Sequence, residues 1–262
     1  MTENYKESFS QLVDLHQRVK WLHPSIEKCY PVALAEAQRL AIYDFDTAVG
    51  QYRFNKHISL PMPIPRGIRS AFQLEEYRGR IACVVTPEIF DSREGFVTIL
   101  HEFVHCYQYE TCEQDLKREL DIAQKAQEVG DCMWEIEHPF PYRSQNFTRG
   151  YMNFLSAIES DDHEAIQKTR KKLRSYLGVH DYEYMVWQEW KEGFARWVEN
   201  CVKRYLSMSE NITGSTQPFS RVIFYVGGEA YISFLCQEDK DLLGDLPGLF
   251  HSLYLINPGT SI

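Results

Sequence analysis

Two histidines four residues apart, with a glutamate directly after the first, are the residues of this chain best suited to chemistry. They stand in the stretch ILHEFVHCYQ, from Ile99 to Gln108. On an α-helix, positions i and i+4 differ by about 40° in direction and about 6 Å in height, so His101 and His105 project from one face. Two imidazoles at that separation suit a tetrahedral zinc ion, and Glu102 stands where a carboxylate takes a proton from a water that the metal activates.

The residues around this motif predict the helix that it requires. Asp91 is suited to cap the helix N-terminus, and Glu94 stands three residues later as its partner in a capping box. We expect the helix over about residues 92–110, with Cys106 turned about 100° away from its histidine neighbour as a buried thiol. The opposite face carries an apolar stripe formed by Phe96, Leu100, Phe103, Val104 and Tyr107. The polar trio therefore does not compete with the core for space.

A catalytic zinc takes a third protein ligand, which must come from outside this stretch. The metzincin pattern would place Gly at position 108 and His at position 111. The chain has Gln108 and Thr111 there, which excludes that class. Residues further along the chain remain as candidates for the third ligand, namely Glu192, Asp181, His163 and Glu189.

We favour Glu192, because its segment WKEGFARWVE combines a carboxylate with small and aromatic residues. Gly193 and Ala195 follow it closely, and small residues let another helix or a metal approach. The aromatic anchors of the segment are Trp190, Phe194 and Trp197. Glu189 shares a helix face with Glu192, so Glu189 and, with less support, Glu199 are candidates for hydrogen bonds that orient the histidines.

The order of these motifs resembles a known family. HEFVH followed by EGFARWVE resembles the gluzincin metallopeptidases, in particular the peptidase MA-like proteins with an E-G-x-A second motif. The resemblance covers about residues 80–240 and implies a zincin-like catalytic core with Glu192 as the third zinc ligand. The segment FYVGGEAYISFL is similar to the family's downstream Tyr-x-x-Gly segment, with Tyr225 and Gly228 at the matching places. It implies that Tyr225 donates a hydrogen bond to the oxyanion.

The sequence departs from the gluzincin pattern in two respects. The gap between His105 and Glu192 is long, which predicts additional helices between the two ligand helices. The stretch GVHDYEY, residues 178–184, partly resembles the aspzincin segment Gly-Thr-x-Asp-x-x-Tyr-Gly, which would make Asp181 the ligand. It lacks the threonine and the final glycine of that segment, and Asp181 stays open as an alternative.

Composition and charge limit the partners of this chain. Its 262 residues include 28 basic and 37 acidic side chains, for a net charge of −9. The one basic run, formed by Arg170, Lys171, Lys172 and Arg174, is expected on a solvated helix face. This pattern disfavours nucleic-acid binding. The N-terminus lacks an apolar segment, and no run of 18 apolar residues occurs, so we expect no membrane segment and a cytoplasmic protein. The seven cysteines are scattered without CxxC spacing, which argues against a disulfide framework.

The periodicity of apolar residues predicts an α+β, predominantly helical fold with a small β-sheet and additional helices. Helices are expected over residues 4–22, 31–44, 113–129, 147–176, 183–206 and 222–237, and strands over residues 50–60 and 79–90. No linker divides the chain, so we predict a single zincin-like domain over residues 1–262, with residues 1–75 as its helical N-terminal part.

These observations favour a zinc-dependent peptidase that acts on a peptide or protein substrate, with Glu102 as general base. One alternative is an ImmA-like regulatory protease that cleaves one protein partner. It would usually bring a helix-turn-helix or a partner domain, and neither is evident. The other alternative is a binding protein of zincin fold without catalysis. The presence of Glu102 argues against it, because a structural zinc site has no use for a general base. The sequence leaves the oligomeric state open.

Overall fold

The structure, a computed structural model, describes residues 5–36, 38–60 and 64–254 of the chain. Its internal contacts separate into two compact units. The sheet unit comprises residues 1–111 and 198–210, and the helical unit comprises residues 112–197 and 211–262. Helix α8 (Val179–Tyr205) is continuous, and its residues from Val198 onward belong to the sheet unit. The expectation of one domain over the whole chain stays a prediction.

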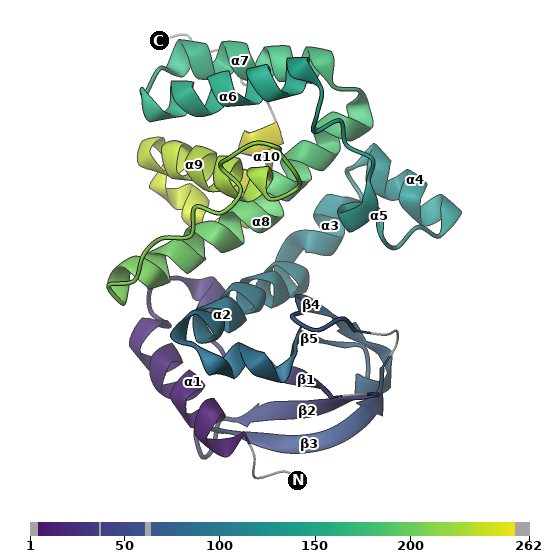
Figure 1. Cartoon of the computed structure of the whole chain (residues 1–262), viewed down its shortest axis with the longest axis vertical. Helices are drawn as coiled ribbons and strands as arrows, with labels where there is room; N and C mark the ends of the chain where they lie inside the picture. The colour runs from purple at the N-terminus through teal and green to yellow at the C-terminus, as the bar shows by residue number, and fades with distance from the viewer. Residues whose placement is uncertain (1–4, 37, 61–63, 255–262) are drawn as a thin grey trace. The chain divides into compact units, whose positions relative to one another are not determined.

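A five-stranded mixed sheet is the framework of the sheet unit, with the order β3-β2-β1-β5-β4 (Figure 1). The strands are β1 (Val32–Glu36), β2 (Arg39–Asp46), β3 (Gln51–Ser59), β4 (Arg69–Leu74) and β5 (Arg80–Val85). β1 pairs in parallel with β5, whereas the β1–β2, β2–β3 and β4–β5 pairs are antiparallel. The strands predicted over residues 50–60 and 79–90 are confirmed as β3 and β5. β4 is an edge strand that runs antiparallel to its neighbour.

The helix predicted over residues 31–44 is wrong, because β1 and β2 form an antiparallel pair there, with Ala33 opposite Ile42. The segment contains four alanines and two leucines, which favour helices in isolation. Pairing with β5 outweighs this preference, since β1 becomes a central strand whose residues Val32, Ala33 and Leu34 are fully buried. Of residues 1–75, the predicted helix at 4–22 is confirmed as α1 (Lys6–Val19), but the helical character predicted for this whole part is wrong.

The two faces of the sheet have different coverings. α1 packs against β3, and α2 (Arg93–Gln108) packs against β4 and β5 (Figure 1). On this face, Phe9 of α1 stacks on Tyr52 of β3 with ring centroids 4.8 Å apart. Successive side chains in a strand point to opposite faces. Those on the other face form a second apolar cluster, which includes Ile42, Ile58 and Val84. Both faces are therefore closed by apolar packing, and α2 lies against β4 and β5.

The helical unit contains short and long α-helices. They are α3 (Gln114–Lys117), α4 (Asp121–Val129), α5 (Trp134–Glu137), α6 (Gln145–Glu159), α7 (His163–Tyr176), most of α8, α9 (Ile223–Glu238) and α10 (Leu246–Tyr254). The helices predicted over residues 113–129 and 147–176 are each interrupted. At the second interruption Asp162 caps α7, its side chain accepting a hydrogen bond from the backbone N–H of Ala165. None of the helices in the described part of the chain has the length and apolarity to cross a membrane.

Arg170 lies in the core of the helical unit, although we predicted it on a solvated face. Its side chain is 1% exposed and donates to both carboxylate oxygens of Glu189, at 2.9 and 2.8 Å. It also donates to the backbone carbonyl of Leu253, so one side chain joins α7 to α8 and α10. Lys171 and its two basic neighbours Lys172 and Arg174 are exposed, as predicted.

Helices α8 and α9 approach each other at glycines. A Cβ atom on Gly193 would lie 2.5 Å from the Cα atom of Gly228, and a Cβ atom on Gly228 would lie 2.2 Å from the carbonyl oxygen of Glu189. Side chains at either position would push the helices apart, because backbone atoms cannot move aside individually. The contact fixes the first turns of α9 against the turn of α8 that carries Glu192. The predicted close approach of a helix to Gly193 is thus confirmed, with α9 as the neighbour.

Candidate metal centre

Capping and close packing fix the start of α2, the helix that carries the motif HEFVH. The hydroxyl of Ser92 accepts a hydrogen bond from the backbone N–H of Gly95 at 3.2 Å, which makes Ser92 the N-cap. The cap predicted at Asp91 is wrong, since this residue ends the preceding 3-10 turn, Pro87–Asp91. That turn lies so close that a Cβ atom on Gly95 would stand 1.7 Å from the carbonyl oxygen of Ile89.

Both histidines of the motif are buried, and the Nδ1 atom of each is bound to a neighbouring oxygen. His101 Nδ1 donates to Glu199 Oε2 at 3.0 Å. His105 Nδ1 donates to Gln108 Oε1 at 2.9 Å. A carboxylate oxygen and an amide oxygen only accept hydrogen bonds, so Nδ1 carries the proton of each ring. In the neutral form of both rings, Nε2 then presents a lone pair.

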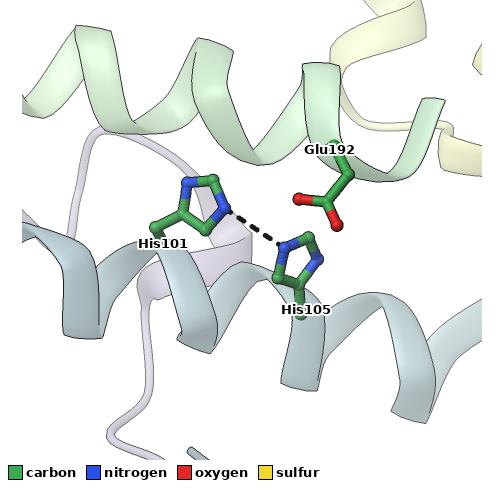
Figure 2. A group of neighbouring side chains, drawn as sticks. All are labelled: His101, His105 and Glu192. Atoms are coloured by element: carbon green, nitrogen blue, oxygen red, sulfur yellow. Dashed lines mark hydrogen bonds between the residues drawn. The ribbon is translucent and has the colours of Figure 1, made fainter. Parts of the chain in front are cut away.

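The two Nε2 atoms face each other. They lie 3.2 Å apart, and Figure 2 shows the rings turned toward one another from successive turns of α2. Lone pairs at this separation repel each other, and a proton or a metal ion between them removes the repulsion. Imidazole nitrogens held in this way by a hydrogen bond at Nδ1 are the usual form of histidine ligands. The donor set therefore fits a metal ion.

Glu192 completes a group of three possible ligands. One ligand atom each of His101, His105 and Glu192 lies within 4.8 Å of the others, and all three side chains are buried. Figure 2 shows the carboxylate of Glu192 pointing from α8 toward the two rings. α8 also carries Glu199, which binds His101. Two positions seven residues apart on a helix lie on nearly the same side, so both carboxylates project from one side of α8.

Glu102 is also buried, with 5% of its surface exposed. Burial raises the pKa of the Cys83 thiol on β5, and the charge of Glu102 raises it further. The carboxylate of Glu102 is therefore near enough to Cys83 to act on it electrostatically. Its role as general base stays a prediction.

Arg221, which stands just before α9, contacts Glu192 directly. Its Nη1 atom donates to Glu192 Oε1 at 3.0 Å and to Gln188 Oε1 at 3.3 Å. Burial alone would lower the pKa of Arg221, but Tyr225 and Glu192 outweigh it and raise the pKa, so the guanidinium stays charged. The Tyr225 ring lies 5.6 Å from the guanidinium of Arg221 and 5.2 Å from that of Arg196. The oxyanion contact expected of Tyr225 stays a prediction.

The other candidates for the third ligand lie elsewhere. Asp181 accepts a hydrogen bond from His138 Nε2 at 2.7 Å. His163 Nδ1 is 3.0 Å from the carboxylate of an exposed glutamate. Glu189 is fully buried against Arg170, so the suggestion that it orients a histidine of the motif is wrong. Among the described residues, the one group with metal-ligand geometry is His101, His105 and Glu192.

Some residues around the histidines were not anticipated from the sequence. Gln108, which departs from the metzincin pattern, accepts a hydrogen bond from His105. Lys203 Nζ lies 3.5 Å from Glu199 Oε1 and 2.6 Å from Glu94 Oε2, so it joins α8 to α2. The spacings from His105 to Gln108 and from Glu199 to Lys203 are those of neighbouring side chains on a helix. Both contacts could therefore have been predicted from the sequence.

Comparison with known proteins does not identify this chain. No protein-family model matches it, and neither a curated protein nor a solved structure shows significant similarity to it.

Proposed function

We propose that this chain is a zinc-dependent peptidase in which His101, His105 and Glu192 bind the metal and Glu102 is the general base. The observation that carries the proposal is the pair of Nε2 atoms 3.2 Å apart, each on a ring whose Nδ1 is bound to an oxygen. A metal ion shared by the two rings would replace the hydrogen bond that joins them in its absence.

The number and type of ligands support a catalytic site over a structural one. Structural zinc sites are closed by four protein ligands, whereas catalytic sites use three and leave a position open. Two histidines and one glutamate are a set found in zinc peptidases. A zinc ion held by this set would polarise the carbonyl of a bound substrate and lower the pKa of a water molecule at the open position.

Glu102 supplies the proton transfers that peptide hydrolysis requires. Its carboxylate would accept a proton from the attacking water and then deliver it to the amine that leaves. It follows His101 directly on α2, which is the position of the general base in HExxH sites. Its burial removes competing water, which strengthens the electrostatic interactions of the carboxylate with its neighbours.

An edge strand supports a peptide as the substrate. β4 lies at one end of the sheet order, and α2 packs against it. An extended peptide binds to such an edge by adding backbone hydrogen bonds, which hold any sequence in an extended conformation. The gluzincin relationship and the zincin-like core are part of this proposal. The cytoplasmic location and the action on one regulatory partner remain expectations from the sequence.

Metal analysis and a protease assay test the proposal together. The purified protein should retain about one zinc per chain after dialysis. It should hydrolyse fluorescein-labelled casein, with loss of activity on chelation and recovery on addition of zinc. Glu102→Gln should retain the metal and the fold but lose about 100-fold or more of the rate. A wild-type chain without zinc, or a zinc-loaded chain without hydrolysis, would refute the proposal.

A further inference from the structure

Arg221 occupies a position that zinc binding alone does not explain. Its guanidinium donates to an oxygen of Glu192, the proposed third ligand. A cation beside a metal ligand repels the metal and competes for the same carboxylate. A hydrogen bond to a ligand carboxylate can orient that ligand, but this role needs only the nitrogen that contacts Glu192. The rest of the guanidinium is placed to meet a negatively charged group that enters the site during function.

The helix packing holds Arg221 firmly at this place. α9 begins two residues after it, at Ile223, and the glycine contact between Gly193 and Gly228 fixes α9 against α8. The hydrogen bonds to Glu192 and Gln188 use one nitrogen of the guanidinium. The other two nitrogens make no hydrogen bond to any residue in the described ranges. The side chain is 30% exposed, so those donors face solvent rather than the core.

Charge balance indicates what the guanidinium meets. Glu192 and Glu102 together neutralise the two charges of a zinc ion, and the histidines are neutral as ligands. Arg221 then leaves one positive charge in excess. When water adds to a peptide carbonyl, its oxygen bonds to the carbonyl carbon, its proton passes to Glu102, and the π electron pair moves onto the carbonyl oxygen. The negative charge of the site thereby passes from Glu102 to the carbonyl oxygen, where a guanidinium donor can stabilise it.

We propose that Arg221 is a further catalytic residue of this site, whose guanidinium donates a hydrogen bond to the carbonyl oxygen as negative charge develops on it. This assignment rests on the proposed peptidase function. Tyr225 supports the arginine, because its ring lies 5.6 Å from the guanidinium and limits the directions that the side chain can take. When the C–N bond breaks, the electron pair on the oxygen restores the carbonyl, the bond's electrons go to the nitrogen, and Glu102 returns the proton to it.

The test compares Arg221→Ala and Arg221→Lys with the wild-type protein, all loaded with zinc. Rates on labelled casein over a range of concentrations give kcat and KM, and competition with a chelator gives zinc affinity. Arg221→Ala should lower kcat about 100- to 1000-fold with little change in KM, as expected for a lost transition-state donor. Its zinc affinity should stay equal or rise, because a repelling charge is gone. Arg221→Lys should recover part of kcat.

Arg174→Ala is the matched control, since Arg174 also lies over a tyrosine ring in the helical unit, 5.4 Å from Tyr182. It should behave as wild type in every measurement. If Arg221→Ala loses zinc as Glu192→Ala does, the arginine merely holds the ligand and the assignment falls. The same conclusion follows if Arg221→Ala keeps a wild-type kcat. Either result leaves the peptidase proposal intact. An inactive wild-type chain, by contrast, refutes the peptidase proposal and the assignment together.

Discussion

The Nε2 atoms of His101 and His105 lie 3.2 Å apart because the other nitrogen of each ring is bound elsewhere. Glu199 holds the first ring and Gln108 holds the second. These two hydrogen bonds decide which ring nitrogen carries the proton, and they aim the unprotonated nitrogens at a common point. The site is thus arranged by the oxygens behind the rings as much as by the spacing of the histidines on α2.

Removal of a ligand should abolish tight zinc binding. His101→Ala, His105→Ala and Glu192→Ala each leave two ligands, which seldom hold the ion. We expect a loss of affinity larger than the roughly 10–100-fold typical of an outer hydrogen-bonding partner. Chelator competition measures it, with His180→Ala, a partly exposed residue bound to Asp121, as control. Wild-type affinity in Glu192→Ala would exclude this residue as a ligand.

The hydrogen bond that Glu199 accepts from His101 should strengthen zinc binding. Glu199→Ala leaves the Nδ1 proton of His101 without its acceptor and frees the ring to turn, so zinc affinity should fall about 10–100-fold. Glu199→Gln should recover part of this loss, because the amide oxygen still accepts the hydrogen bond. A purely structural role for Glu199 would lower thermal stability equally in both variants and leave their zinc affinities alike. Glu210→Gln, at an exposed ion pair, serves as control.

The sequence predicted the local parts of the site well, because they depend on a single helix. The i, i+4 spacing in α2 required only helical geometry, and the small Gly193 in an aromatic segment indicated a close helix contact. Both are properties of neighbouring residues, which periodicity captures. The choice of Glu192 over Asp181 and His163 agrees with the group that the structure forms, because the segment around it carried a packing signature.

The features that the sequence did not reveal depend on partners distant in the chain. Residues 31–44 favour a helix locally, and only the distant strand β5 makes them strands. The basic neighbours of Arg170 predict an exposed position for it, although its ion pair with Glu189 is buried. Arg221 has no motif around it, and α9 alone brings it to Glu192. A single sequence carries no direct record of such pairings, so composition and periodicity misplace residues of this kind.

The buried pair Arg170–Glu189 should be a major contributor to the stability of the helical unit. Both side chains are at most 1% exposed, and the loss of one partner leaves the other charge buried and unpaired. Arg170→Met or Glu189→Gln should lower the free energy of unfolding by about 3–5 kcal/mol. Urea denaturation measures this, and Lys171→Ala, an exposed neighbour, should change it by less than about 0.5 kcal/mol. A loss below about 1 kcal/mol in both single variants would contradict the prediction.

A second charged cluster should make the stability of the helical unit depend on pH. Lys117 Nζ lies 2.6 Å from Glu135 Oε1, and Lys191 Nζ lies 2.7 Å from Glu135 Oε2. Trp187 also donates to the same carboxylate, at 3.0 Å. Burial alone would raise the pKa of Glu135, but Lys191 and Lys117 outweigh it and hold the pKa well below the ordinary value of 4.5.

A carboxylate with a depressed pKa stabilises the folded state at any pH above its unfolded pKa, and this stabilisation is lost as the pH falls below that value. The metal-free protein should therefore lose stability below about pH 4.5, with Glu135 contributing at most about 1.4 kcal/mol per pH unit. In Glu135→Gln this contribution is absent, so the difference in free energy of unfolding from wild type should be largest at pH 7 and shrink toward pH 3. Urea denaturation at a series of pH values measures it, with Glu128→Gln, at an exposed position of α4, as control. A difference that stays constant from pH 7 to pH 3 would show that the folded protein does not hold Glu135 ionised.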